Sequence, residues 1–166
     1  EAWKVVKPPF VYTDPDIVPT EDCPDNLVEF LLDAAARYGY PNKIGVGLKI
    51  DDIPDHYSQA EKVRTWEAQN WARPLGKFKD VEMYAAGVDT TFALYPRFTP
   101  FSLSAIRTGE PYVARHLDWY EDSNNPSEER LHYEQTAAKG CHTWGLNDVY
   151  SRAVKNHYEK AKQNAE

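Results

Sequence analysis

The sequence lacks several features that each define a class of protein. It has only two cysteines, Cys23 and Cys141, which form neither a disulfide framework nor a zinc-site spacing and leave the redox compartment open. No apolar run approaches the length of a membrane span, so no transmembrane segment is expected. The net charge is -7 and no Lys/Arg run is present. Because nucleic-acid binding requires a basic surface, nucleic acid is not an expected partner.

Motifs of the common enzyme classes are also missing. The chain contains no Walker loop and no GxGxxG, HExxH, GxSxG or CxxC pattern, so kinase, nucleotide-dehydrogenase, zinc-protease and serine-hydrolase functions lose their main support. An acidic enzyme can still bind an anionic nucleotide if a divalent cation lies between its carboxylates and the phosphates. The composition is therefore compatible with a metal-bridged ligand.

What is present is the composition of a soluble globular protein. Apolar residues make up 42% and charged residues 27% of 166 residues, which predicts one domain over residues 1–166 and a cytoplasmic location. The sequence opens with Glu1 rather than Met and shows no signal pattern. We expect a processed product or a fragment.

Hydrophobic patterning predicts alternating strands and helices. Residues 10–13 form a short β-favouring run that stops at an acidic pair. From Asp25, a candidate N-cap, a helix is predicted that Gly39 closes. Its apolar residues at helical spacing, which predict one buried face, are Leu27, Phe30, Leu31, Ala34 and Ala35. Residues 43–50 (KIGVGLKI) are predicted to be a buried strand whose glycines indicate close approach of another backbone or a ligand. The remaining predicted elements are a helical segment from Ser58, one or two strands over 82–95 interrupted near Gly87, a short strand at 105–107 and a helix over 146–161. This alternation indicates an α/β or α+β fold with polar motifs at strand ends.

Asp14 and Asp16 are the first candidate metal ligands. They lie two residues apart directly after an extended run, so both carboxylates can face one cation while Pro15 restricts the backbone. Hard divalent ions take oxygen ligands and keep positions for phosphate oxygens. Asp-Pro-Asp is also a common turn sequence, and on this motif alone the turn is the slightly better interpretation.

His116 is the third candidate ligand. An imidazole could complete a carboxylate site that prefers Mn over Mg, although a single histidine is more often a hydrogen-bonded structural residue. The order along the chain favours the metal site: an acidic pair at a strand end, a later strand, and then a segment rich in His and aromatic residues.

Four segments together resemble the GT-A-fold glycosyltransferases, including bacterial family 2-like members. Residues 10–19 (FVYTDPDIVP) resemble the DxD motif, and residues 84–95 (YAAGVDTTFALY) look like the strand that lines the donor and acceptor pocket. Residues 106–109 (IRTG) and 111–120 (PYVARHLDWY) look like the C-terminal segment from which a histidine reaches the metal.

The resemblance implies a GT-A-like, partly Rossmann-like mixed sheet flanked by helices. It further implies that Asp14, Asp16 and His116 bind a divalent cation, Mn or Mg, which holds a nucleotide-sugar donor. Family members carry a nucleotide-binding βαβ region before the DxD strand, and only nine residues precede Phe10. Three explanations are left open: the chain is a fragment that lacks this N-terminal segment, a partner chain in a homo-oligomer supplies the base and ribose contacts, or these contacts are made in an unusual way.

Asp89 is the first choice for the catalytic base. An inverting transfer needs a group that takes the acceptor hydroxyl proton, and a carboxylate buried among apolar neighbours can have its pKa raised towards that role. The alternative, weighed equally, is a structural carboxylate that accepts hydrogen bonds from Thr90 or Arg107.

Further residues are candidates for substrate binding. Each has a structural alternative. The two adjacent aspartates could belong to a solvated turn, and the glutamate could lie at an exposed helix position. The arginine could form an ion pair, and the two tryptophans could be core residues. Glu67 is also a second candidate base, because the neighbouring indole could form a platform for a sugar ring. These candidates are Asp51, Asp52, Trp66, Glu67, Arg107 and Trp119.

The function expected from these residues is metal-dependent transfer of a sugar from a nucleotide-sugar to a glycan or other hydroxyl acceptor. The alternatives are a non-catalytic carbohydrate-binding or assembly module derived from the same fold, and a carboxylate-metal phosphoesterase, which needs a water nucleophile and often two metals.

Overall fold

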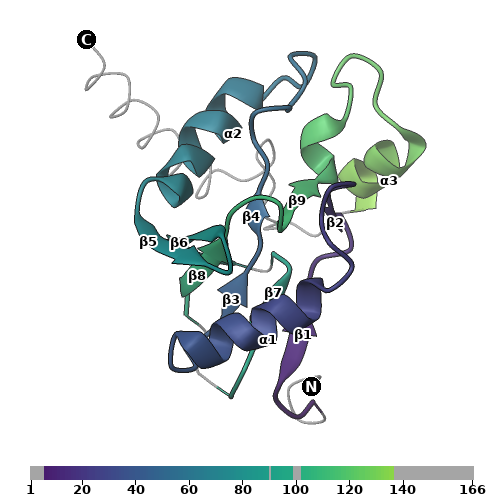
Figure 1. Ribbon diagram of the computed structural model, residues 1–166. Coiled ribbons are helices and arrows are strands. Elements are labelled where there is room, and N and C mark those ends of the chain that lie inside the picture. Colours follow the sequence, from purple (N-terminus) through teal and green to yellow (C-terminus); the bar gives the residue numbers. More distant parts are fainter. Residues whose placement is uncertain (1–5, 90, 99–101, 137–166) are drawn as a thin grey trace. The chain divides into compact units, whose positions relative to one another are not determined.

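The computed structural model describes residues 6–89, 91–98 and 102–136 and has a mixed α/β fold with few helices (Figure 1). The elements in chain order are β1 (Phe10–Tyr12), β2 (Ile17–Pro19), α1 (Leu27–Arg37), β3 (Ile44–Gly45), β4 (Gly47–Leu48), α2 (Ala60–Glu67), the 3-10 helix η2 (Ala68–Trp71), β5 (Pro74–Phe78), β6 (Val81–Gly87), β7 (Ala93–Tyr95), β8 (Ser104–Thr108), β9 (Val113–His116), the 3-10 helix η3 (Leu117–Tyr120) and α3 (Glu128–Thr136). The helix expected at 146–161 lies outside the described residues. No helix of the described part is long and apolar enough to cross a membrane.

The chain divides into two compact units. The first contains the residues up to Lys49 together with Gln69–His116, and the second contains Ile50–Ala68 and the residues from Leu117 onwards. All described strands and α1 belong to the first unit, whereas α2, η3 and α3 belong to the second. The boundary between Ala68 and Gln69 falls within η2.

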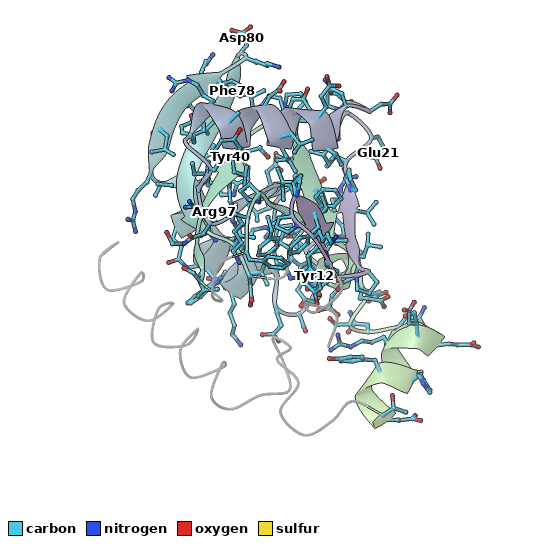
Figure 2. All side chains as sticks on the ribbon, turned by 90° about the horizontal axis from the view of Figure 1, so that it is seen from below. Tyr12, Glu21, Tyr40, Phe78, Asp80 and Arg97 are labelled. Atoms are coloured by element: carbon cyan, nitrogen blue, oxygen red, sulfur yellow. The ribbon has the colours of Figure 1, made fainter. Side chains whose placement is uncertain are left out.

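Two sheets form the first unit. The larger has the strand order β1-β7-β3-β8-β6-β5, and the smaller has the order β2-β9-β4. Within them β3 pairs with β8 and β4 pairs with β9 in parallel, and the other pairs are antiparallel. The architecture is thus a mixed sheet, as expected. Asp80 lies at the tip of the β5–β6 hairpin and is labelled in Figure 2.

The strand predicted over residues 43–50 is divided between the two sheets. It contributes β3 to the larger sheet and β4 to the smaller, with the buried Val46 between them. The expected close approach at its glycines is confirmed. A Cβ on Gly45 would lie 2.8 Å from a methyl carbon of Val88, and one on Gly47 would lie 2.5 Å from the carbonyl oxygen of Thr108.

Helix α1 has the core-facing side that the sequence predicts. Its buried residues are Leu27, Phe30, Leu31, Ala34 and Ala35, and they pack against β3 and β7. The chain leaves the helix through Gly39, whose φ of 70° suits glycine at the end of a helix.

The start of α1 differs from the expectation that Asp25 caps it. The residue before the helix is Asn26, which makes no side-chain capping bond. Its Oδ1 instead accepts a hydrogen bond of 2.9 Å from the hydroxyl of Tyr112, whose ring stacks on Phe30 at 4.0 Å between centroids. The helix start is therefore fixed by the chain before β9 rather than by a local cap.

Gly47→Ala is expected to lower the free energy of unfolding by about 2 kcal/mol, because overpacking a close-packed position typically costs this much. Besides the contact with Thr108, the added methyl would lie 2.6 Å from the indole of Trp71. Urea denaturation followed by circular dichroism measures the change.

The matched control is Gly87→Ala. A Cβ there meets only Leu103, at 3.6 Å or more, so its unfolding free energy should stay within about 0.5 kcal/mol of wild type or rise slightly. Equal losses in the two variants would contradict the packing argument.

Candidate metal and substrate site

Strand pairing brings Asp16 and His116 together. Asp16 directly precedes β2 and His116 is the last residue of β9, and the antiparallel register sets Ile17 opposite His116. The distance from Asp16 Oδ2 to His116 Nδ1 is 3.4 Å, and the two side chains are 40% and 25% exposed, respectively. These two sequence-predicted ligands thus form one half-buried pair.

The Asp-Pro-Asp segment is also a turn. The Asp14 carbonyl accepts a hydrogen bond from the Thr13 hydroxyl at 3.0 Å and from the backbone N–H of Ile17 at 3.3 Å. This turn carries the chain from β1 in the larger sheet to β2 in the smaller. The segment therefore forms a turn, as one interpretation expected, and the same turn carries the Asp16 side chain that pairs with His116.

A carboxylate and an imidazole suit a divalent cation with few protein ligands. Adjacent ligands of an octahedral ion with bonds of about 2.1 Å lie about 3.0 Å apart, so the pair needs only a small adjustment to contact one ion. The described residues contain no group of three or more His, Cys, Asp or Glu arranged to hold a metal. The pair fits a site that takes its remaining ligands from a substrate and water, and its imidazole favours Mn over Mg.

Asp89 does not have the buried environment that was expected. Its side chain is exposed, whereas the preceding Val88 is fully buried. Asp89 lies in a bend beyond the end of β6 at Gly87, whereas the expectation placed it among strand residues. A role for Asp89 as a base must therefore rest on its access to a ligand rather than on burial.

The segment that carries Asp89 is firmly held. Arg107 Nε donates to the Gly87 carbonyl at 2.7 Å, the Val88 N–H donates to the Leu103 carbonyl at 2.9 Å, and Lys43 Nζ donates to the Asp89 carbonyl at 3.1 Å. Backbone groups from Gly87 to Asp89 are thus hydrogen-bonded, and the Asp89 side chain is exposed.

Two buried cations provide these anchors. Arg107 is 5% exposed and Lys43 is 1% exposed. Burial lowers the pKa of Lys43; the Asp89 carboxylate opposes this shift and Arg107 adds to it. The Arg107 Nε donates to a backbone carbonyl, and the expected role of Arg107 in substrate binding or in an ion pair stays a prediction. Sequence reasoning missed Lys43, although its position at the start of a buried apolar run was the available signal.

Asp51 and Asp52 are exposed residues of a turn in the second unit. The Tyr120 hydroxyl donates a hydrogen bond to Asp52 Oδ1. This arrangement agrees with the solvated-turn alternative, and it leaves substrate binding by these two residues as a prediction.

Glu67 is buried, with 5% exposure. The structural alternative, an exposed helix residue, was therefore wrong. The physical reason is its place on α2, where it follows Val63 by one helical turn and joins Ala60 and Val63 on the buried face. Trp66, its neighbour, is half-buried.

Trp119 belongs to the core of the second unit. It is 2% exposed, and a ring covered on both faces offers no platform for a sugar. The expectation of a substrate-binding indole at this position is therefore corrected. Trp119 lies in η3, the single 3-10 turn that follows β9 directly.

A polar network in the second unit was not anticipated. The buried Tyr57 hydroxyl donates to Asp118 Oδ2 at 3.4 Å, and Arg130 pairs with Asp118 Oδ1. Burial raises the pKa of Tyr57 well above its usual value, and the Asp118 carboxylate adds to the shift. The network connects the loop before α2, η3 and α3.

Comparison with known proteins supplies no relative for this chain. No protein-family model, no curated protein and no solved structure matches it. Its geometry and its sequence motifs therefore carry the functional proposal.

Tyr57→Phe is expected to cost about 1 kcal/mol at pH 7, because the hydrogen bond to Asp118 is lost. A tyrosine whose pKa is raised on folding contributes stability that is complete below its unfolded pKa of 10.0 and lost as pH rises above it. The variant should therefore lose less stability than wild type above pH 10.

Urea denaturation from pH 7 to pH 11 measures this difference. Tyr40→Phe, at a position that is 53% exposed, is the control and should match wild type at pH 7. Parallel alkaline losses in Tyr57→Phe and wild type would contradict the assignment to Tyr57.

Proposed function

We propose that this chain forms the metal-binding and acceptor-side part of a GT-A-like glycosyltransferase, which transfers a sugar from a nucleotide-sugar donor to a hydroxyl acceptor. The observation that carries the proposal is the distance of 3.4 Å between Asp16 and His116. A DxD-like turn and a late histidine were singled out separately in the sequence, and the register of β2 with β9 makes them neighbours.

In this proposal Asp16 and His116 hold Mn or Mg, whereas Asp14, in the same turn, does not form a three-ligand group with them. The cation would neutralise charge on the diphosphate leaving group. The Asp16 side chain is 40% exposed, so one side of the pair is accessible to a ligand.

Asp89 is the favoured base. A general base must reach the hydroxyl proton that it removes, and the Asp89 carboxylate is exposed on an anchored segment. Glu67, the second candidate, is 5% exposed and so has little access to an acceptor. An accessible carboxylate on a hydrogen-bonded segment favours Asp89 as the group that positions and deprotonates the acceptor.

The test is binding of UDP and GDP with and without Mn²⁺, measured by calorimetry. Wild type should bind at least one nucleotide more tightly when Mn²⁺ is present. Asp16→Asn and His116→Gln should each reduce this Mn-dependent gain at least about tenfold, since even supporting residues of metal sites typically contribute this much.

Asp33→Asn is the matched control. Asp33 forms an ion pair with Lys79 on the surface of α1, and its loss should leave nucleotide binding unchanged. Equal binding with and without Mn²⁺, or full binding in Asp16→Asn, would contradict the proposal. Binding of a glycan without metal or nucleotide would instead favour the non-catalytic carbohydrate-binding module.

A further inference from the structure

A polar cleft of about 280 Å³ lies beside β6 and β8 in the first unit. Its lining includes Ala85, Ala86 and Gly87 of β6 and Ala105 of β8, which have small side chains or none. The polar residues that line it are Gln69, Asn70, Arg73 and Ser104.

Backbone hydrogen bonds hold the residues that line the cleft in place without a ligand. Ladder pairing sets Gly87 opposite Ser104, and the Ala85 N–H donates to the Arg73 carbonyl at 2.9 Å. The bond from Arg107 Nε fixes the Gly87 carbonyl from within the unit. A preformed wall lowers the ordering cost of binding.

The charge of this cleft is opposite to that of the chain. The sequence has 26 acidic residues against 19 basic ones, yet among the described residues none of those lining the cleft is acidic, and Arg73 supplies a positive charge. An arginine fork recognises carboxylate or phosphate oxygens, and carboxamides and hydroxyls exchange hydrogen bonds with ligand hydroxyls.

A second cleft of the first unit differs in the pairing of its cations. It measures about 160 Å³ and also contains cations, but its Lys49 is bonded to Glu110 at 3.0 Å and its Arg115 to Glu21. A ligand anion there would have to displace a carboxylate. The observations therefore favour the cleft at Arg73.

We propose that the cleft at Arg73 binds a hydroxylated ligand of monosaccharide size that carries one anionic group, a carboxylate or a phosphate. The volume lies at the lower end of the roughly 300–1,000 Å³ of small-molecule sites, which suits one sugar ring and not a whole nucleotide-sugar. Arg73 binds the anionic group, and the carboxamides of Gln69 and Asn70 bind ring hydroxyls.

The position of the cleft connects it to the proposed reaction. Gly87 lines the cleft, and Asp89 follows two residues later, so their Cα atoms are at most about 7 Å apart. The ligand is then the acceptor, an acidic or phosphorylated sugar. This assignment as acceptor rests on the proposed glycosyltransferase function, whereas binding in the cleft does not require it.

The test measures binding of glucuronate, glucose 6-phosphate and glucose to the full chain at low salt, by NMR titration without Mn²⁺ or nucleotide. At least one anionic sugar should bind about tenfold or more tightly than glucose, because a charge-assisted hydrogen bond contributes this much. Comparison of the two anions distinguishes a carboxylate ligand from a phosphate ligand.

Two variants locate the site. Arg73→Gln should reduce binding of the anionic sugar to the level of glucose. Gly87→Val should also weaken binding, because Gly87 lines the cleft and an added side chain there takes up part of its volume. Arg97→Gln removes an exposed arginine (labelled in Figure 2) that does not line the cleft, and should bind as wild type does.

Equal affinity for glucose and both anions, or undiminished binding in Arg73→Gln and Gly87→Val, would overturn the inference. A chain that binds Mn–nucleotide but no anionic sugar leaves the proposed function standing and removes this site. A chain that binds the anionic sugar in the cleft but no Mn–nucleotide retains the site and removes the transferase.

Discussion

The close contact of Gly47 with Thr108 and Trp71 is the constraint on which the first unit depends. It allows one short run, Ile44–Leu48, to pair within the larger sheet as β3 and within the smaller as β4. The smaller sheet continues from β4 through β9 to β2, and the pairing of β2 with β9 sets Asp16 beside His116. A bulkier residue at position 47 would push β4 away from Thr108 and Trp71.

Local sequence patterns were sufficient for elements that are determined by their own periodicity. Helix α1 has the five buried residues that its spacing predicts, and the interruption near Gly87 separates β6 from β7. The division of residues 43–50 between two sheets was not predictable from that segment, because it depends on residues far along the chain, Trp71 and Thr108. Likewise, Asn26 is bound by Tyr112 rather than capping its own helix.

The sequence predicted which residues form the candidate site better than it predicted whether their side chains are exposed. The order of motifs singled out Asp16 and His116, which the strand register joins. Exposure was misjudged at two carboxylates. Glu67 lies one helical turn after the buried Val63, so the 3.6-residue period of the helix contained the answer. Asp89 lies in a bend beyond the end of β6, where strand alternation no longer applies. The burial of Trp119 agrees with the core position that was its structural alternative.

The turn at Asp14–Asp16 has a consequence for the mechanics of the first unit. It joins the outermost strand of the larger sheet, β1, to an outer strand of the smaller one, β2. A ligand that binds Asp16 and His116 adds a crosslink between β2 and β9 that the backbone ladder alone does not provide. Since any molecule that binds only the folded chain stabilises it in proportion to the logarithm of its concentration, the smaller sheet, with its strands of two to four residues, would gain resistance to opening from each increase in ligand concentration.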